Sequence, residues 1–142
     1  MFLKQWICFF FLLIFPLMGQ SKSQHPCESL IDCDKKADLT SIHRKKITLL
    51  TTGINEFGKD ETVQSLLPLY LKRSKSTLLE ANGETGYTGE IVLKVSHKPE
   101  YRIGQFKKAE ADLSFIEKNL SFCSPEQMKE YHLLKEMLDN SK

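Results

Sequence analysis

An alternating apolar stretch near the middle of the chain restricts the fold more than any other feature, because it carries the one convincing strand signal. The expected first strand spans Glu90–His97, in which every second residue is apolar: Ile91, Leu93 and Val95. A turn at Lys98–Glu100 contains Pro99 and leads into an expected second strand, Tyr101–Phe106. The pattern therefore predicts an antiparallel β-hairpin.

Burial of one face decides the register of this expected hairpin. An odd loop length pairs Val95 with Ile103 and places Tyr101 on the same face as the alternating apolar residues. An even loop length would place Arg102 and Gly104 there instead and would expose half of the apolar residues. Two strands alone are only marginally stable, so the hairpin must pack on helices or gain a third strand. Its free edge is a candidate docking site for another protein.

Three glycines, spaced three residues apart, precede that strand: Gly83, Gly86 and Gly89. A phosphate-binding glycine loop leads into a helix and usually has a lysine at its end, whereas this loop is expected to follow a helix and to precede a strand. The sequence therefore favours a flexible entry to the hairpin. Together with Tyr87 in the loop and with Tyr101 and Arg102 in the second strand, the three glycines form the predicted binding loop and edge.

Two helices are expected before the hairpin. The first begins near Asp38, which can cap it, and has an apolar stripe that contains Leu39, Ile42, Leu49 and Leu50. The second begins after Asp60, has a kink or a restart at Pro68, and stops at Asn82-Gly83. Its apolar stripe contains Val63, Leu66, Leu67, Tyr70, Leu71 and Leu78. Three basic residues near its middle are predicted to form a solvated face: Lys72, Arg73 and Lys75.

Two further helices are expected after the hairpin. The first has a core stripe that contains Phe106, Ala109, Leu113, Ile116 and Leu120. The second has the clearest local start, with Ser124 as the cap, Pro125 at the first helical position and Gln127 completing a capping box. Because only Ser121–Ser124 joins the two helices, they should lie antiparallel as a helical hairpin.

The first residues of the chain predict export. Lys4 precedes an uncharged apolar run, Trp6–Leu17, which is followed by small and polar residues. This order is typical of a secretory signal peptide, and the run is short for a membrane span. We therefore expect a signal peptide over residues 1–23 and one secreted or periplasmic domain over residues 24–142. The fold class of that domain is α+β and mainly helical, with two helices, a central β-hairpin and a C-terminal helical hairpin.

Loss of the signal would balance the charge of the chain. The whole chain has 20 basic and 18 acidic residues and a net charge of +2. Cleavage after Ser23 would remove Lys4 and Lys22, which leaves 18 residues of each sign. A balanced exported domain gives no reason to expect a nucleic acid or an anionic membrane as its partner.

Besides Cys8 in the expected signal, the chain has three cysteines: Cys27, Cys33 and Cys123. In an oxidising compartment at least one disulfide is the default, and the odd number leaves one thiol free or bonded to a second chain. Pairing of Cys27 with Cys33 would close a small loop within Gln20–Lys36, a segment expected to be irregular. Pairing of either with Cys123 would restrain more of the unfolded chain and stabilise the fold by about 4 to 5 kcal/mol. The sequence leaves the pairing open.

No motif for a metal ion, a cofactor or catalysis stands out, and none of these is expected. The spacing of Cys27 and Cys33 is wrong for a zinc knuckle, and the four histidines have no local metal spacing. One enzymatic alternative is a small glycosidase-like hydrolase that uses the carboxylates on either side of the glycine loop: Glu80, Glu84 and Glu90. Such an enzyme needs two carboxylates a few ångströms apart.

The sequence favours a small exported protein without enzymatic activity that binds another secreted or envelope protein, as an inhibitor or an immunity-type protein does. The reasons are the expected signal peptide, the small size, the lack of a cofactor motif and the free strand edge beside a loop. The alternatives are the small hydrolase and a structural subunit that dimerises through its odd cysteine.

Overall fold

The computed structural model describes residues 25–141, so the expected signal peptide and its cleavage site lie outside the described part of the chain. Within that part, five α-helices and one antiparallel two-stranded sheet form a mainly helical α+β fold, which confirms the predicted fold class at this level. In chain order the elements are α1 (Leu30–Leu39), α2 (His43–Thr52), a π-helical turn (Gly53–Phe57), α3 (Val63–Ala81), β1 (Glu84–Thr88), β2 (Ile91–Lys94), α4 (Pro99–Lys118), a short 3-10 helix (Leu120–Phe122) and α5 (Pro125–Asp139).

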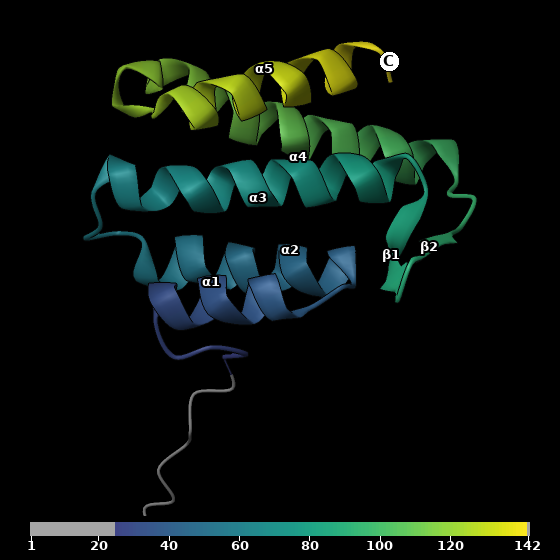
Figure 1. Cartoon of the computed structure of the whole chain (residues 1–142), viewed down its shortest axis with the longest axis horizontal. Helices are drawn as coiled ribbons and strands as arrows, with labels where there is room; N and C mark the ends of the chain where they lie inside the picture. The colour runs from purple at the N-terminus through teal and green to yellow at the C-terminus, as the bar shows by residue number, and fades with distance from the viewer. Residues whose placement is uncertain (1–24, 142) are drawn as a thin grey trace, which may run out of the picture.

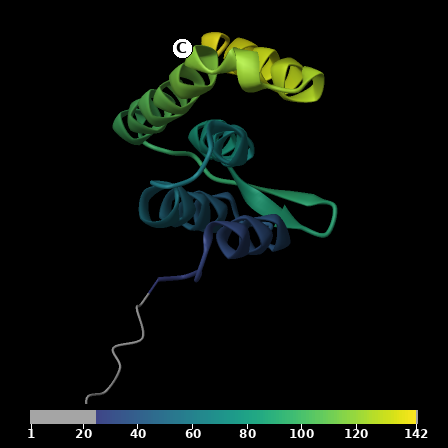
Figure 2. The ribbon, with the colours of Figure 1, turned by 90° about the vertical axis from the view of Figure 1, so that its left-hand side faces the viewer.

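Helix α3 forms the central layer of the fold. Figure 1 shows α3 between two helical pairs, with α1 and α2 on one side and α4 and α5 on the other. Figure 2, in which α3 is seen almost end-on, shows the same three layers. The helix continues through Pro68, so this proline marks no restart. The hairpin lies at the end of the molecule where α3 ends, because only Asn82 and Gly83 separate α3 from β1.

The two faces of α3 bury different apolar residues. One buried cluster joins α3 to α4 and α5 and contains Leu67, Leu71 and Leu78 of α3. A second cluster joins α3 to α1 and α2 and contains Leu69 of α3. A helix that packs on two sides needs buried positions around more of its circumference than a surface helix does. The single apolar stripe expected for this helix therefore describes only part of its burial.

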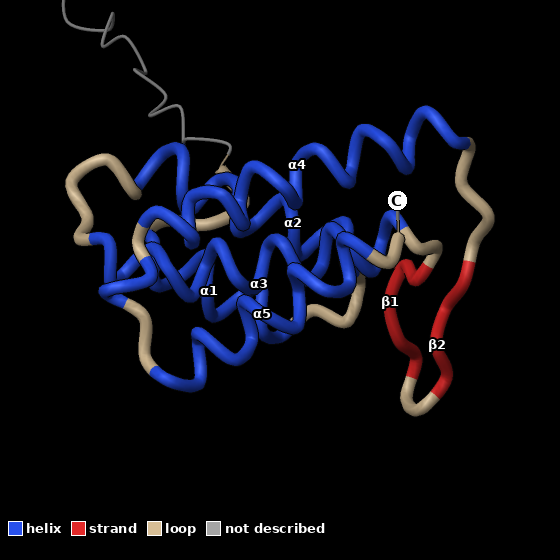
Figure 3. The backbone as a smooth tube through the Cα atoms, turned by 90° about the horizontal axis from the view of Figure 1, so that it is seen from above, coloured by secondary structure: helices blue, strands red, loops and turns tan. Residues whose placement is uncertain are grey.

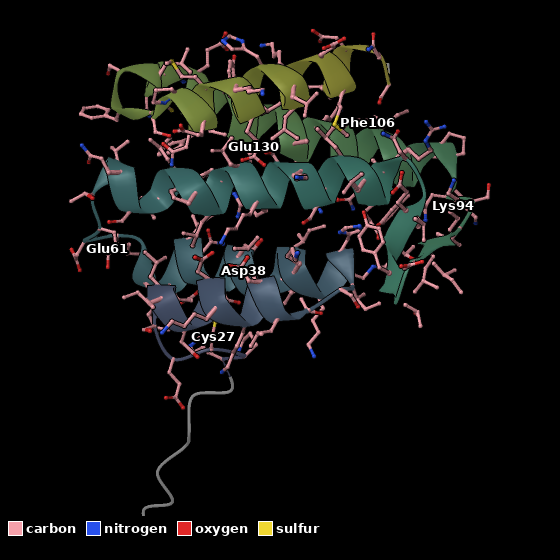
Figure 4. All side chains as sticks on the ribbon, in the orientation of Figure 1. Cys27, Asp38, Glu61, Lys94, Phe106 and Glu130 are labelled. Atoms are coloured by element: carbon pink, nitrogen blue, oxygen red, sulfur yellow. A yellow bond between two sulfur atoms is a disulfide. The ribbon has the colours of Figure 1, made fainter. Side chains whose placement is uncertain are left out.

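Ion pairs also join α3 to both neighbouring layers. The prediction of a solvated basic face is therefore wrong for Lys72 and Arg73, which are partly buried, whereas Lys75 is exposed. The pairs are Lys72 with Asp34 and Asp38 of α1, Arg73 with Asp112 of α4, and Lys75 with Glu130 of α5. Figure 4 shows two of these acidic residues, Asp38 and Glu130, on opposite sides of α3. Local patterns contain no sign of these pairs, because the partners are distant along the chain.

The pair between Arg73 and Asp112 is the most buried of the three, with side chains that are 16% and 6% exposed. Arg73 Nε donates to Asp112 Oδ2 at 2.9 Å and Nη2 donates to Oδ1 at 2.6 Å, which is a bidentate geometry. Arg73 Nη1 also donates to Thr51 Oγ1 at 3.3 Å, so one side chain joins α2, α3 and α4. Burial raises the pKa of Asp112 although Arg73 opposes that shift, so desolvation of the carboxylate outweighs the attraction.

The start of the domain differs from the sequence prediction. Helix α1 follows Ser29, whose hydroxyl accepts from the Asp32 N–H at 3.1 Å, and Asp38 lies inside α1 and does not begin a helix. The backbone is extended at Thr40, so α1 and α2 are separate helices and the predicted apolar stripe crosses the break between them. Leu39, at the end of α1, is consequently 87% exposed.

Cys27 and Cys33 form a disulfide, and Cys123 is a free thiol. Of the pairings that the sequence left open, the structure thus has the one with the short loop, which contributes about 2 kcal/mol in the chain-entropy model. Both bonded cysteines are buried, and Gly53 packs against Cys33, since a Cβ at Gly53 would lie 3.0 Å from Cys33 Cβ. Gln20–Lys36, expected to be irregular, is helical from Leu30 onward.

The hairpin lies earlier in the chain than the sequence predicts. Its first strand, β1, is the glycine segment that was expected to be a flexible entry, and Tyr101–Phe106 belongs to α4 instead of a second strand. The predicted pairing of Val95 with Ile103 is therefore wrong. Pro99 is the first residue of α4, a position that suits its fixed φ and its missing N–H. From residue 25 onward, three α-helices precede the hairpin, one more than expected.

Two predicted helix ends and one predicted arrangement are confirmed. Ser124 caps α5 in a full capping box with Gln127, in which the two backbone N–H groups donate at 3.2 and 2.9 Å. Helix α3 stops at Asn82-Gly83, although its cap is Thr62 and not Asp60. Helices α4 and α5 run antiparallel across their short connection (Figure 1).

Asp112→Ala should lower the free energy of unfolding by about 3 kcal/mol, because it leaves the Arg73 guanidinium buried without its partner. Replacement of both residues, Arg73→Met with Asp112→Leu, should recover most of that loss, since neither charge then remains buried. Urea denaturation measures both effects. As a control, Glu130→Ala removes the more exposed pair with Lys75 and should cost less than about 1 kcal/mol. A double variant that is less stable than Asp112→Ala would contradict this account.

Candidate functional site

The hairpin turns over two residues, Gly89 and Glu90, between β1 and β2. Gly89 has a φ of 59°, as the first residue of a type II′ turn requires. The facing pairs along the ladder are Thr88 with Ile91, Tyr87 with Val92, and Gly86 with Leu93. The glycine segment therefore forms a tight, regular hairpin and not a loop.

Strand β1 is fixed to the helical body on its other side. Gly86 forms an isolated antiparallel bridge with Ile42, and the Tyr87 N–H donates to the Ser41 carbonyl oxygen at 3.2 Å. A Cβ at Gly86 would lie 2.5 Å from that oxygen, and the φ of 154° here is one that side chains rarely adopt. Only glycine permits so close an approach of β1 to the connection between α1 and α2.

Strand β2 forms the outer edge of the hairpin, as Figure 3 shows. Because the Tyr87 N–H is directed at Ser41, Tyr87 and Val92 face each other without hydrogen bonds between them. The N–H and C=O of Val92 therefore point away from β1, and within residues 25–141 no other strand pairs with this outer edge. Four apolar side chains nearby are exposed: Tyr87 at 37%, Ile91 at 69%, Val92 at 37% and Val95 at 46%.

A polar cluster lies at the base of the hairpin, around the carboxylate of Glu80 in the last turn of α3. Glu80 is 1% exposed, and its Oε1 accepts from Arg44 Nη2 at 3.1 Å and from Tyr101 Oη at 3.0 Å. His97, between β2 and α4, has its Nε2 3.5 Å from the same oxygen. We refer to Arg44, Glu80, His97 and Tyr101 as the Glu80 cluster. It joins α2, α3, α4 and the segment that leaves the hairpin.

Arg44 and Tyr101 both bind one oxygen of this carboxylate, and the other oxygen, Oε2, is buried without a hydrogen-bond partner among the described residues. Arg44 Nη2 donates to Tyr101 Oη at 3.3 Å as well as to the carboxylate, so the three side chains form a closed network. Burial raises the pKa of Tyr101, and Glu80 acts in the same direction, so the hydroxyl stays protonated as a donor. The Glu80 cluster can therefore orient the hairpin relative to three helices.

His43 lies beneath β1 at the start of α2 and is 4% exposed. Its ring packs edge-on against Tyr87, with ring centroids 5.5 Å apart, and neither ring nitrogen has a hydrogen-bond partner within the described chain. Burial lowers the pKa of His43, Lys46 adds to this shift, and Glu80 and Glu84 oppose it. The ring is therefore neutral at neutral pH and supports β1 by packing.

The structure brings the predicted loop residues together but places the predicted edge residues elsewhere. Gly83, Gly86, Tyr87 and Gly89 all lie in β1 or next to it. Tyr101 is on α4 and reaches the base of the hairpin through Glu80. Arg102 is also on α4, where its Nε donates to the Ala81 carbonyl oxygen at 3.2 Å and its guanidinium lies over Phe106.

Sequence reasoning missed the residues of α2 and of the connection before it that hold the hairpin: Ser41, His43 and Arg44. Their partners lie about forty residues or more further along the chain, so no local spacing connects them. The cluster of a histidine and basic residues at the start of a helix was the one available signal. It is unfavourable at the positive end of a helix dipole and thus indicates a tertiary role.

The three carboxylates of the hydrolase hypothesis have different surroundings. Glu80 is buried in the Glu80 cluster, Glu84 is half-buried in β1, and Glu90 is exposed in the turn. Two grooves on the surface, one between α4 and the end of α5 and one between α1 and α2, are not lined by any of them. The hydrolase hypothesis stays a prediction.

Three further findings bear on the site. Among residues 25–141, no three histidine, cysteine or acidic side chains lie close enough together to hold a metal ion. None of the helices in that range has the length and apolar character needed to span a membrane. Comparison of the chain with protein-family models, curated proteins and solved structures gave no significant match.

Gly86→Ala should lower the free energy of unfolding by about 2 kcal/mol or more, because the new Cβ would meet the Ser41 carbonyl oxygen and the Ile42 backbone. Gly104→Ala is the matched control. It lies in α4 with nothing within 4 Å of an added Cβ, so the substitution should be neutral or stabilise by up to about 1 kcal/mol. Thermal unfolding compares the two variants, and equal effects would contradict the proposed role of Gly86.

The buried His43 predicts a loss of stability on acidification. Because its pKa in the folded protein lies below the ordinary value of 6.5, the unfolded state binds this proton first as the pH falls. The free energy of unfolding should therefore decrease from about pH 7 down to the folded pKa. In His43→Phe, which keeps a ring against Tyr87, this part of the pH dependence should disappear. Urea denaturation at about pH 7.5 and about pH 5.5 tests it, and an unchanged difference would refute it.

Proposed function

We propose that this protein binds another exported protein and that it does so through the outer edge of β2. The observation that carries the proposal is the direction of the Val92 N–H and C=O, which point away from β1 toward an edge without a strand partner in the described chain. An extended segment of a partner that pairs with this edge would satisfy these groups as a third strand.

The side chains near this edge suit an apolar partner strand. Ile91 and Val95 are 69% and 46% exposed, and Val92 on the opposite face is 37% exposed. Alternate side chains of an added strand would cover both faces of β2, because neighbouring residues of a strand point to opposite sides. Burial of apolar side chains on both faces would add to the affinity of the backbone hydrogen bonds.

The hairpin is held in place before any partner arrives. Gly86 and Tyr87 fix β1 to the connection between α1 and α2. After β2, the Val95 N–H donates to the Gly83 carbonyl oxygen at 2.8 Å, and the His97 ring packs against Tyr101 of α4. A binding element that is already ordered loses less conformational entropy on association than a mobile loop does. The anchoring thus supports a role of this hairpin in recognition.

The compartment is part of the same proposal. The expected signal peptide over residues 1–23 supports secretion or a periplasmic location. The disulfide between Cys27 and Cys33 supports an oxidising compartment, where such bonds persist. In that compartment the protein would act on its partner by binding alone, as an inhibitor or an immunity-type protein does.

Val92→Pro should abolish partner binding, because it removes the outward N–H and places a ring at the edge. Since that N–H makes no bond to β1, the hairpin itself should remain intact. Val92→Thr is the control, because it keeps the N–H and a β-branched side chain. Affinity capture from the exported fraction with the three tagged proteins should recover the same partner with wild type and Val92→Thr, and at least about tenfold less with Val92→Pro.

A partner that binds Val92→Pro as well as wild type would place the binding surface elsewhere and contradict the proposal. Turnover of glycan or ester substrates by the purified protein, abolished by Glu84→Gln or Glu90→Gln, would support the hydrolase instead. The circular dichroism spectrum of Val92→Pro should match that of wild type. A match shows that lost binding results from the changed edge of β2 and not from unfolding of the protein.

A further inference from the structure

We infer that, when no partner strand is bound, the outer edge of β2 pairs with β2 of a second copy of this chain, related to the first by a two-fold axis at Val92. The inference rests on the proposed function, because it requires the same open edge. Two hairpins would then form one antiparallel four-stranded sheet in the order β1-β2-β2-β1, with a helical body at each end.

The backbone restricts where this axis can lie. On β2, the N–H and C=O of Val92 point outward, whereas the Leu93 carbonyl oxygen faces β1 and accepts from Thr85 Oγ1 at 3.3 Å. An axis between Val92 and Leu93 would set outward groups of one copy against inward groups of the other. An axis at Val92 pairs outward groups with outward groups, and so does an axis at Leu93, so the side chains along β2 select between the two.

The charges along β2 are complementary in this register. Glu90 of one copy lies opposite Lys94 of the other, two residues on either side of Val92, and the pair occurs twice by symmetry. Tyr87 faces Val92 within each hairpin, so the two copies would form a continuous row of two tyrosines and two valines across the four strands. Opposite charges and aromatic–β-branched neighbours are the cross-strand pairs that stabilise antiparallel sheets.

The same register explains an exposed apolar side chain and excludes one alternative. Ile91, which is 69% exposed, would lie opposite Leu93 of the second copy and lose contact with water. Parallel pairing of β2 with itself would set Glu90 against Glu90 and Lys94 against Lys94, which is unfavourable. The sequence Glu-Ile-Val-Leu-Lys is therefore self-complementary in the antiparallel sense alone.

The outer edge of β2 is open to a second molecule. Figure 3 shows most of the helical body on the far side of β1 from β2, and Figure 4 shows Lys94 at the outer side of the hairpin. A strand pair of about five residues buries less surface than a standard stable interface. The dimer should therefore be reversible. It should form at protein concentrations of about 1 mM and dissociate on dilution to about 1 μM.

Charge reversal tests the register. Sedimentation velocity of the purified protein over this concentration range should show a monomer–dimer equilibrium. Glu90→Lys sets a lysine side chain against Lys94 of the other copy, and Lys94→Glu sets a glutamate side chain against Glu90. Each variant alone should therefore dimerise at least about tenfold more weakly. An equimolar mixture of the two variants provides opposite-charge pairs again and should form a heterodimer, whereas each variant alone stays largely monomeric.

The mixture has a defined pattern of charges. On one side of the axis the introduced lysine of Glu90→Lys faces the introduced glutamate of Lys94→Glu, and on the other side the native Lys94 of the first variant faces the native Glu90 of the second. Both pairs are of opposite charge, so the heterodimer should have near wild-type affinity. Circular dichroism checks that both variants fold, because Lys94 also faces Glu84 within the hairpin.

Matched controls lie at the other end of the molecule. Glu61, labelled in Figure 4 far from the hairpin, and the nearby Lys59 are both exposed. Glu61→Lys and Lys59→Glu make the same changes of net charge as the two test variants, and they should leave the dimer unchanged. Loss of the dimer in these controls would show that net charge and not the register controls association, which would overturn the inference.

The outcomes separate this inference from the proposed function. A wild-type protein that stays monomeric up to about 1 mM, or a mixture of the charge variants that does not associate, overturns the second copy as the occupant. If a different protein is then captured by wild type and lost in Val92→Pro, the edge still binds a partner strand and the proposed function stands. If neither dimer formation nor capture of a different protein depends on Val92, both proposals fail.

Discussion

Burial of α3 on two opposite faces is the constraint on which the other elements depend. A helix in this position cannot leave most of its polar groups to water, so these groups find partners within the fold. Ser74 and Thr77 donate to carbonyl oxygens of their own helix. Arg73 instead reaches Asp112 on α4 and Thr51 on α2. The requirement to satisfy α3 thus helps to fix the positions of the helices on both sides.

The same requirement at the end of α3 positions the hairpin. Glu80 is the last buried acidic residue of α3, and its Oε1 is bound by Arg44 from one layer and by Tyr101 from the other. Since β1 begins three residues after Ala81, the hairpin starts at the point where the two layers are joined. The hairpin is therefore anchored at its base, while its outer strand makes few contacts with the helices. That combination suits an element that presents a strand edge to a partner.

Several features could be predicted because they depend on residues a few positions apart. Ser124, Pro125 and Gln127 form their capping box almost independently of the rest of the chain. The stop of α3 at Asn82-Gly83 has the same local origin. The mainly helical α+β class and the strand Ile91–Lys94 followed from apolar periodicity. A free hairpin edge was also expected, but its residues, Tyr101 and Arg102, were placed on a second strand that is part of α4 in the structure.

The sequence by itself thus determined the fold class, the capped helix ends and one strand, because local hydrogen bonding and periodicity encode these directly. Only the tertiary structure decided what Gly83–Gly89 and Tyr101–Phe106 become. The glycine segment is a strand because Gly86 can approach the Ser41 carbonyl oxygen, and Ser41 is far away in the sequence. Tyr101–Phe106 is helical because Pro99 starts a helix whose buried face continues from Phe106 to Ile116. Pairing across long loops depends on shape and packing in space, which a local pattern does not contain.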